Sequence, residues 1–161
     1  MTDVAARIAA IRSSRDLEEQ RTALNALAAE EPDDGLAQAE AAYAHDRLGR
    51  EAEAIEFYRA ALEAGGLGPE TDRGVRLGLG SSLRALGRYG EAATVLDEAV
   101  ARHPGDGALA VFRAMALYNS GRTKEAVEAL LLLLADTTGD ERISGYEGAI
   151  RTYAEDLDRT W

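Results

Sequence analysis

The sequence contains no cysteine, three prolines and, in Lys124, a single lysine. The absence of cysteine excludes disulfides, thiolate metal sites and cysteine nucleophiles. The scarcity of proline, together with abundant alanine, favours helices. The basic residues are almost all arginine, and a bias towards arginine and alanine is typical of a GC-rich bacterial gene. We therefore expect a helical protein of bacterial origin.

Long apolar runs are also missing. The longest unbroken run covers residues 129–135 and is bounded by Glu128 and Asp136. It cannot span a bilayer, which takes about 20 apolar residues. Residues 1–14 contain no apolar core of signal-peptide length. We therefore expect a cytoplasmic protein that makes no membrane contact.

The charge is strongly negative, with a formal net value of −11 at pH 7. This charge repels phosphate backbones, which argues against nucleic acid as a partner. Hydrophobic residues make up 46 % and charged residues 29 %, as in ordinary globular proteins. The 161 residues are enough for one domain with an apolar interior.

A glycine recurs along the chain at intervals of 38 and then 34 residues, and an alanine follows five residues after each glycine. The pairs are Gly49 and Ala54, Gly87 and Ala92, and Gly121 and Ala126. A fixed period of this size indicates an array of structural repeats.

The repeats share one frame that covers nearly the whole chain. The copies lie at residues 1–34, 35–68, 73–106 and 107–140. The first copy is degenerate, with Arg15 in place of the glycine and Gln20 in place of the alanine. Terminal repeats are often atypical because one of their faces has no neighbour. We expect a single domain over residues 1–161.

Each copy is predicted to form two helices. In residues 73–106, leucines at helical spacing precede Gly87, which ends a first helix. A second apolar stretch ends before Pro104, which stops the second helix. Small residues such as Gly80 and Ala92 would let the two helices cross closely.

Four extra residues, 69–72, precede the third copy. Pro69 suits the first position of a helix, and Gly65 or Gly66 can cap the helix before it. Four residues correspond to about one helical turn. We therefore predict that the first helix of the third copy is one turn longer at its start.

Residues 141–161 are predicted to form one further helix, with Thr138 and Glu141 at the spacing of a capping box. Its apolar residues form one stripe, made of Ile143, Tyr146, Ile150, Tyr153 and Leu157. Two interpretations remain open. The helix covers the exposed face of the last repeat, or it joins the leucines of residues 130–134 in a dimer contact.

The repeat pattern resembles the tetratricopeptide repeat, a helix–turn–helix unit of 34 residues. The matching residues of the third copy are Leu79, Gly80, Gly87, Tyr89, Ala92, Ala99 and Pro104. Gln38, Arg76 and Ala110 replace the large aromatic residue usual near the start of the first helix, and Arg113 replaces a packing leucine. The resemblance implies an all-α solenoid of such repeats, wound as a right-handed superhelix, with a C-terminal capping helix.

No combination of residues suggests catalysis. His45 has no partner motif and is interpreted as a packed core histidine. Residues 78–83, "GLGSSL", lack the lysine of a phosphate loop, and their glycines are better explained by close helix packing. No spacing of His with Asp or Glu is typical of a metal site. We expect neither enzymatic activity, nor a cofactor, nor a metal.

The resemblance also implies that the first helices of the repeats line a concave groove that binds a peptide. The positions carried over are Arg12, Tyr43, Arg47, Leu77, Ser81, Arg84, Met115, Tyr118 and Asn119. Asp46 is the one acid carried over with them. The lysine and asparagine set that some members use to bind a terminal carboxylate is missing.

Three arginines against one acid suggest that the groove binds a peptide with acidic and apolar side chains. In the other interpretation, these arginines pair with acids of neighbouring helices and only add solubility. The sequence thus predicts a non-catalytic scaffold that binds a protein or peptide partner. The alternative is a self-associating module that forms a homodimer through its last repeat and C-terminal helix.

Overall fold

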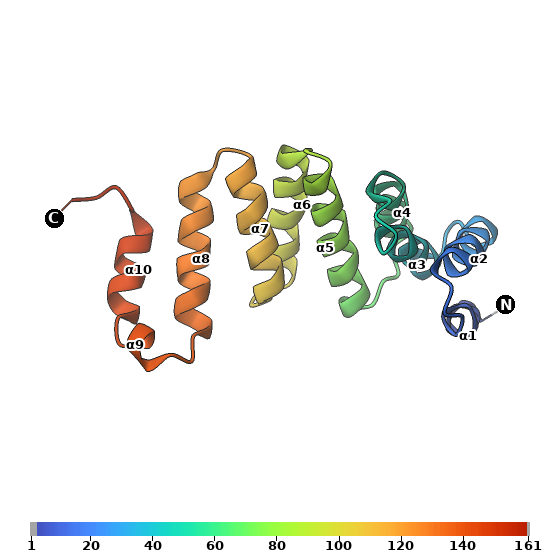
Figure 1. Cartoon of the computed structure of the whole chain (residues 1–161), viewed down its shortest axis with the longest axis horizontal. Helices are drawn as coiled ribbons and strands as arrows, with labels where there is room; N and C mark the ends of the chain where they lie inside the picture. The colour runs from blue at the N-terminus through green and yellow to red at the C-terminus, as the bar shows by residue number, and fades with distance from the viewer. Residues whose placement is uncertain (1–2, 161) are drawn as a thin grey trace. The chain divides into compact units, whose positions relative to one another are not determined.

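The computed structural model describes residues 3–160, which form ten helices and no strand (Figure 1). The chain divides into two compact units, Met1–Arg88 and Tyr89–Trp161. The first unit contains α1 (Val4–Arg12), α2 (Leu17–Glu30), α3 (Gly35–Asp46), α4 (Glu51–Ala64) and α5 (Pro69–Ala85). The second contains α6 (Tyr89–Arg102), α7 (Gly107–Asn119), α8 (Thr123–Thr137), α9 (Glu141–Ser144) and α10 (Glu147–Glu155).

Every predicted copy, the degenerate first one included, contains two helices. Aspartate side chains cap several of these helices by accepting hydrogen bonds from backbone N–H groups in the first turn. The capping residues of α1, α2, α3 and α7 are Asp3, Asp16, Asp34 and Asp106. Each such cap stabilises its helix by about 1 kcal/mol.

The recurring glycine ends the first helix of its copy, as predicted. Gly49, Gly87 and Gly121 adopt φ angles of 67°, 76° and 84°. Residues other than glycine rarely adopt this left-handed backbone conformation, because their Cβ atom would crowd the backbone. The repeat therefore needs glycine at this turn for conformational reasons.

The prediction for residues 69–72 is also confirmed. Helix α5 has 17 residues, whereas α3 has 12 and α7 has 13. Pro69 is its first residue, and Gly65, with φ 72°, caps the end of α4. The extra residues thus lengthen α5 at its start.

The prediction of one continuous C-terminal helix is wrong. The structure has the short α9 and then α10, which begins after Gly145 and Tyr146. Asp140 caps α9 and Thr138 ends α8, so the expected capping box does not form. Gly145 and Gly148 lie within the predicted helix, where each glycine costs roughly 1 kcal/mol relative to alanine. The apolar stripe predicted a continuous helix because the spacing of apolar residues takes no account of these glycines.

Small residues allow close helix contacts inside each unit. Ala42 of α3 and Ala54 of α4 are fully buried in the first unit. Ala114 of α7 and Ala126 of α8, at the same positions of their copy, are buried in the second unit. These alanines occupy the packing positions that the repeat pattern assigns to them.

Two glycines on α5 accommodate two tyrosines from the preceding helices. A Cβ atom at Gly74 would lie 2.5 Å from the hydroxyl of Tyr43, and one at Gly78 would lie 2.2 Å from the hydroxyl of Tyr58. The two tyrosine rings meet edge to face, with centroids 5.7 Å apart. The expectation that glycine in residues 78–83 serves packing is therefore confirmed for Gly78, and Gly74 was not anticipated.

Gly78→Ala is expected to destabilise the protein by about 1–3 kcal/mol, as overpacked sites do. Tyr58 cannot easily move away, because it is buried and its hydroxyl is hydrogen-bonded. Urea denaturation measures the change. Gly90→Ala on α6 is the control, since a Cβ atom there would meet nothing within 4 Å. Equal free energies of unfolding for the two variants would contradict this account of the glycine.

Candidate functional site

A hollow of about 510 Å³ lies on the surface of the first unit. Its lining consists of Arg12 from α1, Tyr43 and Asp46 from α3, and Arg47 at the end of α3. All four were carried over as groove positions from the sequence. The structure thus brings together a cluster of the predicted residues whose members are up to 35 positions apart in the chain.

Asp46 is held by hydrogen bonds from inside the fold. Its Oδ2 accepts from the hydroxyl of Tyr58 on α4 at 2.8 Å, and its Oδ1 accepts from Oγ of Ser82 on α5 at 3.1 Å. Burial and the adjacent Asp46 carboxylate raise the pKa of Tyr58 above its usual range, which keeps the hydroxyl a donor. Asp46 therefore ties three helices together, and both of its oxygens have partners.

Arg12 pairs with a buried acid on a neighbouring helix. Its guanidinium lies 2.7 Å from the carboxylate of Glu40 on α3, whose side chain is only 5 % exposed. Burial raises the pKa of Glu40, and the positive charges of Arg12 and Arg47 oppose that rise. Arg12 therefore pairs with an acid of a neighbouring helix, while its side chain stays half-exposed.

Arg47 differs from Arg12. Its guanidinium donates to Oε1 of Gln20, a neutral group, at 3.3 Å. No acid in the described part of the chain forms an ion pair with it. Tyr43 beside it donates to the Thr71 carbonyl at 3.4 Å, and burial raises the pKa of Tyr43 to about 12. The hollow therefore presents a cation without a direct ion pair among the described residues, next to an aromatic ring.

The other predicted groove residues do not line this hollow. Leu77, Ser81 and Arg84 lie half-buried on α5, outside its lining. The second unit carries the rest, which are Met115, Tyr118 and Asn119 on α7. Sequence reasoning missed Glu40, Tyr58 and Ser82, whose roles arise from contacts between helices and leave no local pattern in the sequence.

His45 belongs to the core, as the sequence predicted. It is buried, its Nε2 lies 3.1 Å from the side-chain amide of Asn25, and its ring stacks on Phe57 with centroids 5.2 Å apart. Nδ1 has no hydrogen-bond partner among the described residues. These contacts explain the histidine without any catalytic role.

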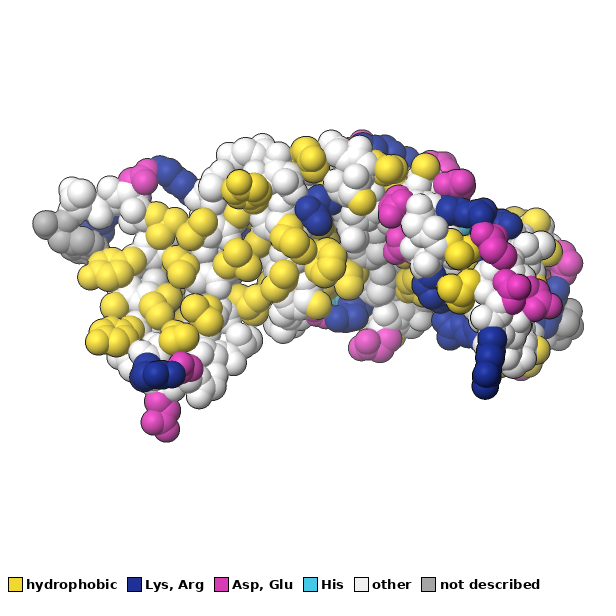
Figure 2. All heavy atoms as spheres, in the orientation of Figure 1, with side chains coloured by type: hydrophobic (Ala, Val, Ile, Leu, Met, Phe, Trp, Pro, Cys, Tyr) yellow, Lys and Arg dark blue, Asp and Glu magenta, His cyan; other side chains and the backbone are white. Residues whose placement is uncertain are grey.

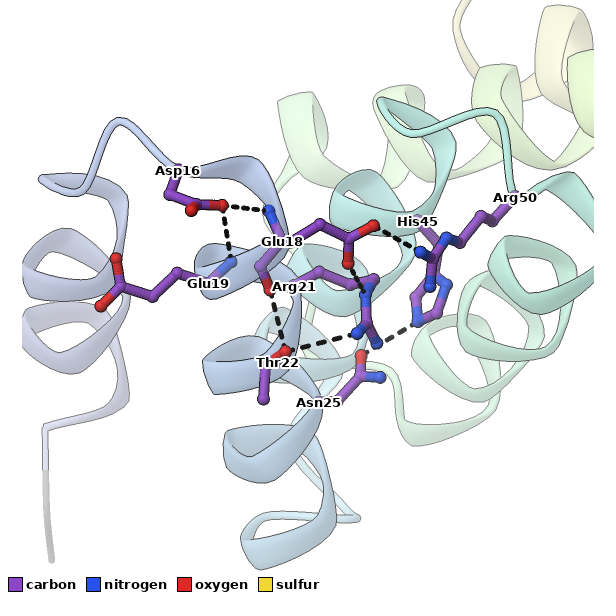
Figure 3. A network of polar contacts seen from close by, with 8 residues as sticks. All are labelled: Asp16, Glu18, Glu19, Arg21, Thr22, Asn25, His45 and Arg50. Carbon is purple, nitrogen blue, oxygen red and sulfur yellow. Dashed lines mark hydrogen bonds and ion pairs between the residues drawn. The ribbon is translucent and has the colours of Figure 1, made fainter.

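Figure 3 shows the polar network beside His45. Glu18 on α2 accepts hydrogen bonds from Arg21, at 2.8 Å, and from Arg50, at the start of α4. Burial first, and then the positive charge of Arg21, lower the pKa of His45 below its ordinary value of 6.5. His45 is therefore neutral in the folded protein near neutral pH.

Two features are absent from the described residues, 3–160. They contain no group of three or more His, Cys, Asp or Glu placed to hold a metal ion. They also contain no helix with the length and apolarity that a membrane crossing requires.

The lowered pKa of His45 predicts a pH-dependent stability. Below pH 6.5 the unfolded state takes up a proton more readily than the folded state, so the histidine's contribution falls as the pH drops towards its folded pKa. Urea denaturation from pH 8 to pH 5 should show the wild type losing stability relative to His45→Phe. Comparison with this variant cancels the opposite contribution of Glu40, whose pKa is raised. Parallel pH profiles would contradict the prediction.

Comparison with known proteins places this fold. No curated protein matches the chain. Among solved structures, the chain is similar to "MamA RS-1 ArsTM double mutant", with a TM-score of 0.71 over 97 % of this chain and 88 % of that one. The identity is 20 %, so this likeness concerns the fold alone. The family model "Tetratrico peptide repeat" matches residues 35–157. Since these residues are most of the sequence, the chain belongs to the tetratricopeptide-repeat family.

Proposed function

We propose that this protein is a non-catalytic scaffold that binds a protein or peptide partner, and that the hollow on the first unit contacts an acidic side chain of that partner. Tetratricopeptide repeats generally serve as protein-interaction modules without catalysis. The observation that carries the proposal is Arg47, an exposed cation in the hollow whose described hydrogen-bond partner is the neutral amide of Gln20.

The chemistry of the hollow favours a carboxylate beside an apolar group. A guanidinium offers a planar fork of donors that matches a carboxylate. Arg12 is also available, because its side chain is half-exposed and Glu40 engages one of its terminal nitrogens. The ring of Tyr43 adds rigid apolar area next to both arginines.

Asp46 does not cancel this preference. Its two oxygens accept hydrogen bonds from Tyr58 and Ser82. These bonds stabilise the carboxylate and direct its oxygens towards α4 and α5. Arg47 and Arg12 are therefore the groups that can donate hydrogen bonds to an incoming acid. The backbone at Asp46 is held in place by the contacts among α3, α4 and α5.

Arg47→Glu is expected to weaken the binding of acidic peptides by tenfold or more. A hydrogen bond to a charged group contributes about 1.5–3 kcal/mol, and each 1.4 kcal/mol is a factor of ten in affinity. An array of synthetic peptides with varied acidic, basic and apolar residues identifies ligands, and calorimetry measures their affinities. We expect the selected peptides to combine Asp or Glu with a large apolar residue and to bind less well at high salt.

Arg15→Glu is the matched control for this experiment. It makes the same charge change at an exposed position on the first unit, outside the hollow. Both variants should keep the wild-type thermal melt. Equal losses of peptide affinity in the two variants, or no loss in Arg47→Glu, would show that the hollow is not the peptide-binding site.

Self-association is the second candidate function, and a specific observation favours it. The second unit carries exposed large apolar side chains on α8 and around α10. Light scattering of the full chain tests this candidate. A particle mass of twice 17.2 kDa would support it, and a mass of 17.2 kDa at all concentrations would exclude it.

A further inference from the structure

The last repeat exposes apolar positions that the earlier repeats bury. On α4, Ile55 and Tyr58 are each 1 % exposed, and α5 packs against this helix. In the repeat frame, the same positions of α8 are Val127 and Leu130, which are 38 % and 43 % exposed.

The third copy confirms that these positions normally pack. Its equivalents on α6 are Ala93 and Leu96, which are 3 % and 0 % exposed, and α7 contacts this helix. Within each unit, therefore, the first helix of the next repeat covers the second helix of the one before. Helix α8 is the second helix of the last repeat, and it lacks this full cover.

Helix α10 covers α8 only in part. It has nine residues, and of these Ala154 is the one that is buried. Arg151 of α10 donates to Asp136 of α8 at 2.6 Å, which ties the two helices together. Leu134, one turn beyond Leu130 on α8, remains exposed. Helix α10 thus lies beside α8 and leaves an apolar strip open.

The exposed side chains of these two helices form what we call the apolar face. It consists of Val127, Leu130 and Leu134 on α8, and Tyr146, Tyr153 and Leu157 in and around α10. Figure 2 shows apolar side chains gathered over the region where Figure 1 draws α8 and α10. Contiguous apolar patches beyond a few hundred Å² are rare on monomers and mark interaction sites.

Two basic side chains beside the apolar face are paired within the same chain. Arg151 binds both Asp136 and Glu147, and Lys124 pairs with Asp158. Because these two basic side chains already form ion pairs within the chain, they do not favour an acidic partner. The face itself consists of aliphatic and aromatic side chains. An uncharged face of this kind fits a second surface like itself.

We infer that the apolar face is the surface through which two copies of this chain dimerise. The inference rests on self-association, the second candidate function. A two-fold axis brings the same patch of both copies together. The aliphatic strip of α8 can then lie against the tyrosines of α10 in the other copy. Tyrosine suits this position because its ring is buried while its hydroxyl reaches solvent at the rim.

The net charge of −11 gives this dimer a distinctive dependence on salt. Two copies repel each other at long range, and added salt screens that repulsion. Dimerisation should therefore strengthen as salt is added. Acidic peptides in the hollow should bind less well under the same conditions, so the two surfaces can be told apart.

The first experiment is multi-angle light scattering on the full chain and on the double variant Leu130→Glu with Leu134→Glu. The wild type should approach twice 17.2 kDa with rising concentration, and the variant should remain at 17.2 kDa. Leu17→Glu is the matched control, because Leu17 is an equally exposed leucine on α2 of the first unit. It should dimerise as the wild type does.

The outcomes separate the surface from self-association itself. A dimer that persists in the double variant would overturn the apolar face while leaving self-association intact. A wild type that stays monomeric at all concentrations and salt levels would overturn both. Neither result bears on peptide binding by Arg47, which is measured separately.

Cysteine cross-linking provides a second readout that does not depend on a destabilising charge. The sequence has no cysteine, so each introduced thiol is unique. A mixture of Leu130→Cys and Tyr153→Cys proteins should form a disulfide-linked dimer under mild oxidation. Mixing Leu17→Cys with Tyr153→Cys should give far less. Equal yields in the two mixtures would overturn the inferred contact.

Discussion

The first unit depends on the hydrogen bond between Tyr58 and Asp46. This bond joins the end of α3, beside the hollow, to α4. Ser82 adds a bond from α5 to the same carboxylate. Such a network stabilises a fold only when its members are satisfied, since a buried polar group without a partner costs about 1–3 kcal/mol. Asp46 meets this condition for both of its oxygens.

The glycines of α5 make that contact sterically possible. Tyr43 and Tyr58 both reach α5 at positions where no Cβ atom is present. The space left by Gly74 and Gly78 lets α5 approach closely enough for Ser82 to reach Asp46. The hollow therefore depends in part on Gly74, Gly78 and Tyr58, which do not line it. Its shape follows from glycine on one helix and tyrosine on two others.

Much of this fold could be predicted from the sequence because it is encoded locally. The turn glycine at Gly87 and the proline at Pro69 act through their own backbone preferences, which no distant residue needs to supply. The C-terminal helix was mispredicted because its apolar stripe was given more weight than the backbone preferences of its glycines. The stripe there suggested burial, while Gly145 and Gly148 disfavoured a continuous helix.

The site was less predictable than the helices. The family resemblance located Arg12, Tyr43 and Arg47, and the structure brings them to one hollow. The ion pair between Arg12 and Glu40 joins residues 28 positions apart, and nothing near either residue indicates it. Arg12 forms an ion pair with an acid and Arg47 a hydrogen bond with a neutral amide, because the fold places different side chains beside them. That information lies in tertiary contacts rather than in local sequence.

Two departures from the repeat pattern are compensated by polar contacts. Gln38 stands where an aromatic residue is usual, and its amide donates to the Ala28 carbonyl at 2.9 Å. Arg113 stands where a leucine is usual, and it pairs with Asp97 on α6 at 2.5 Å. Each substitution thus replaces apolar packing with a hydrogen bond to the neighbouring helix, which preserves the helix contact. These positions are explained by structure and need no ligand.

One position of the repeat frame connects the two proposed surfaces. In the second copy it is Tyr58, which the next helix covers and which holds Asp46 at the hollow. In the copy at residues 107–140 it is Leu130, which is exposed and belongs to the apolar face. A buried tyrosine there needs an acceptor for its hydroxyl, whereas an exposed leucine only needs apolar contact. The same position therefore serves internal order in the second copy, and in the copy at residues 107–140 we propose that it contacts a second copy of the chain.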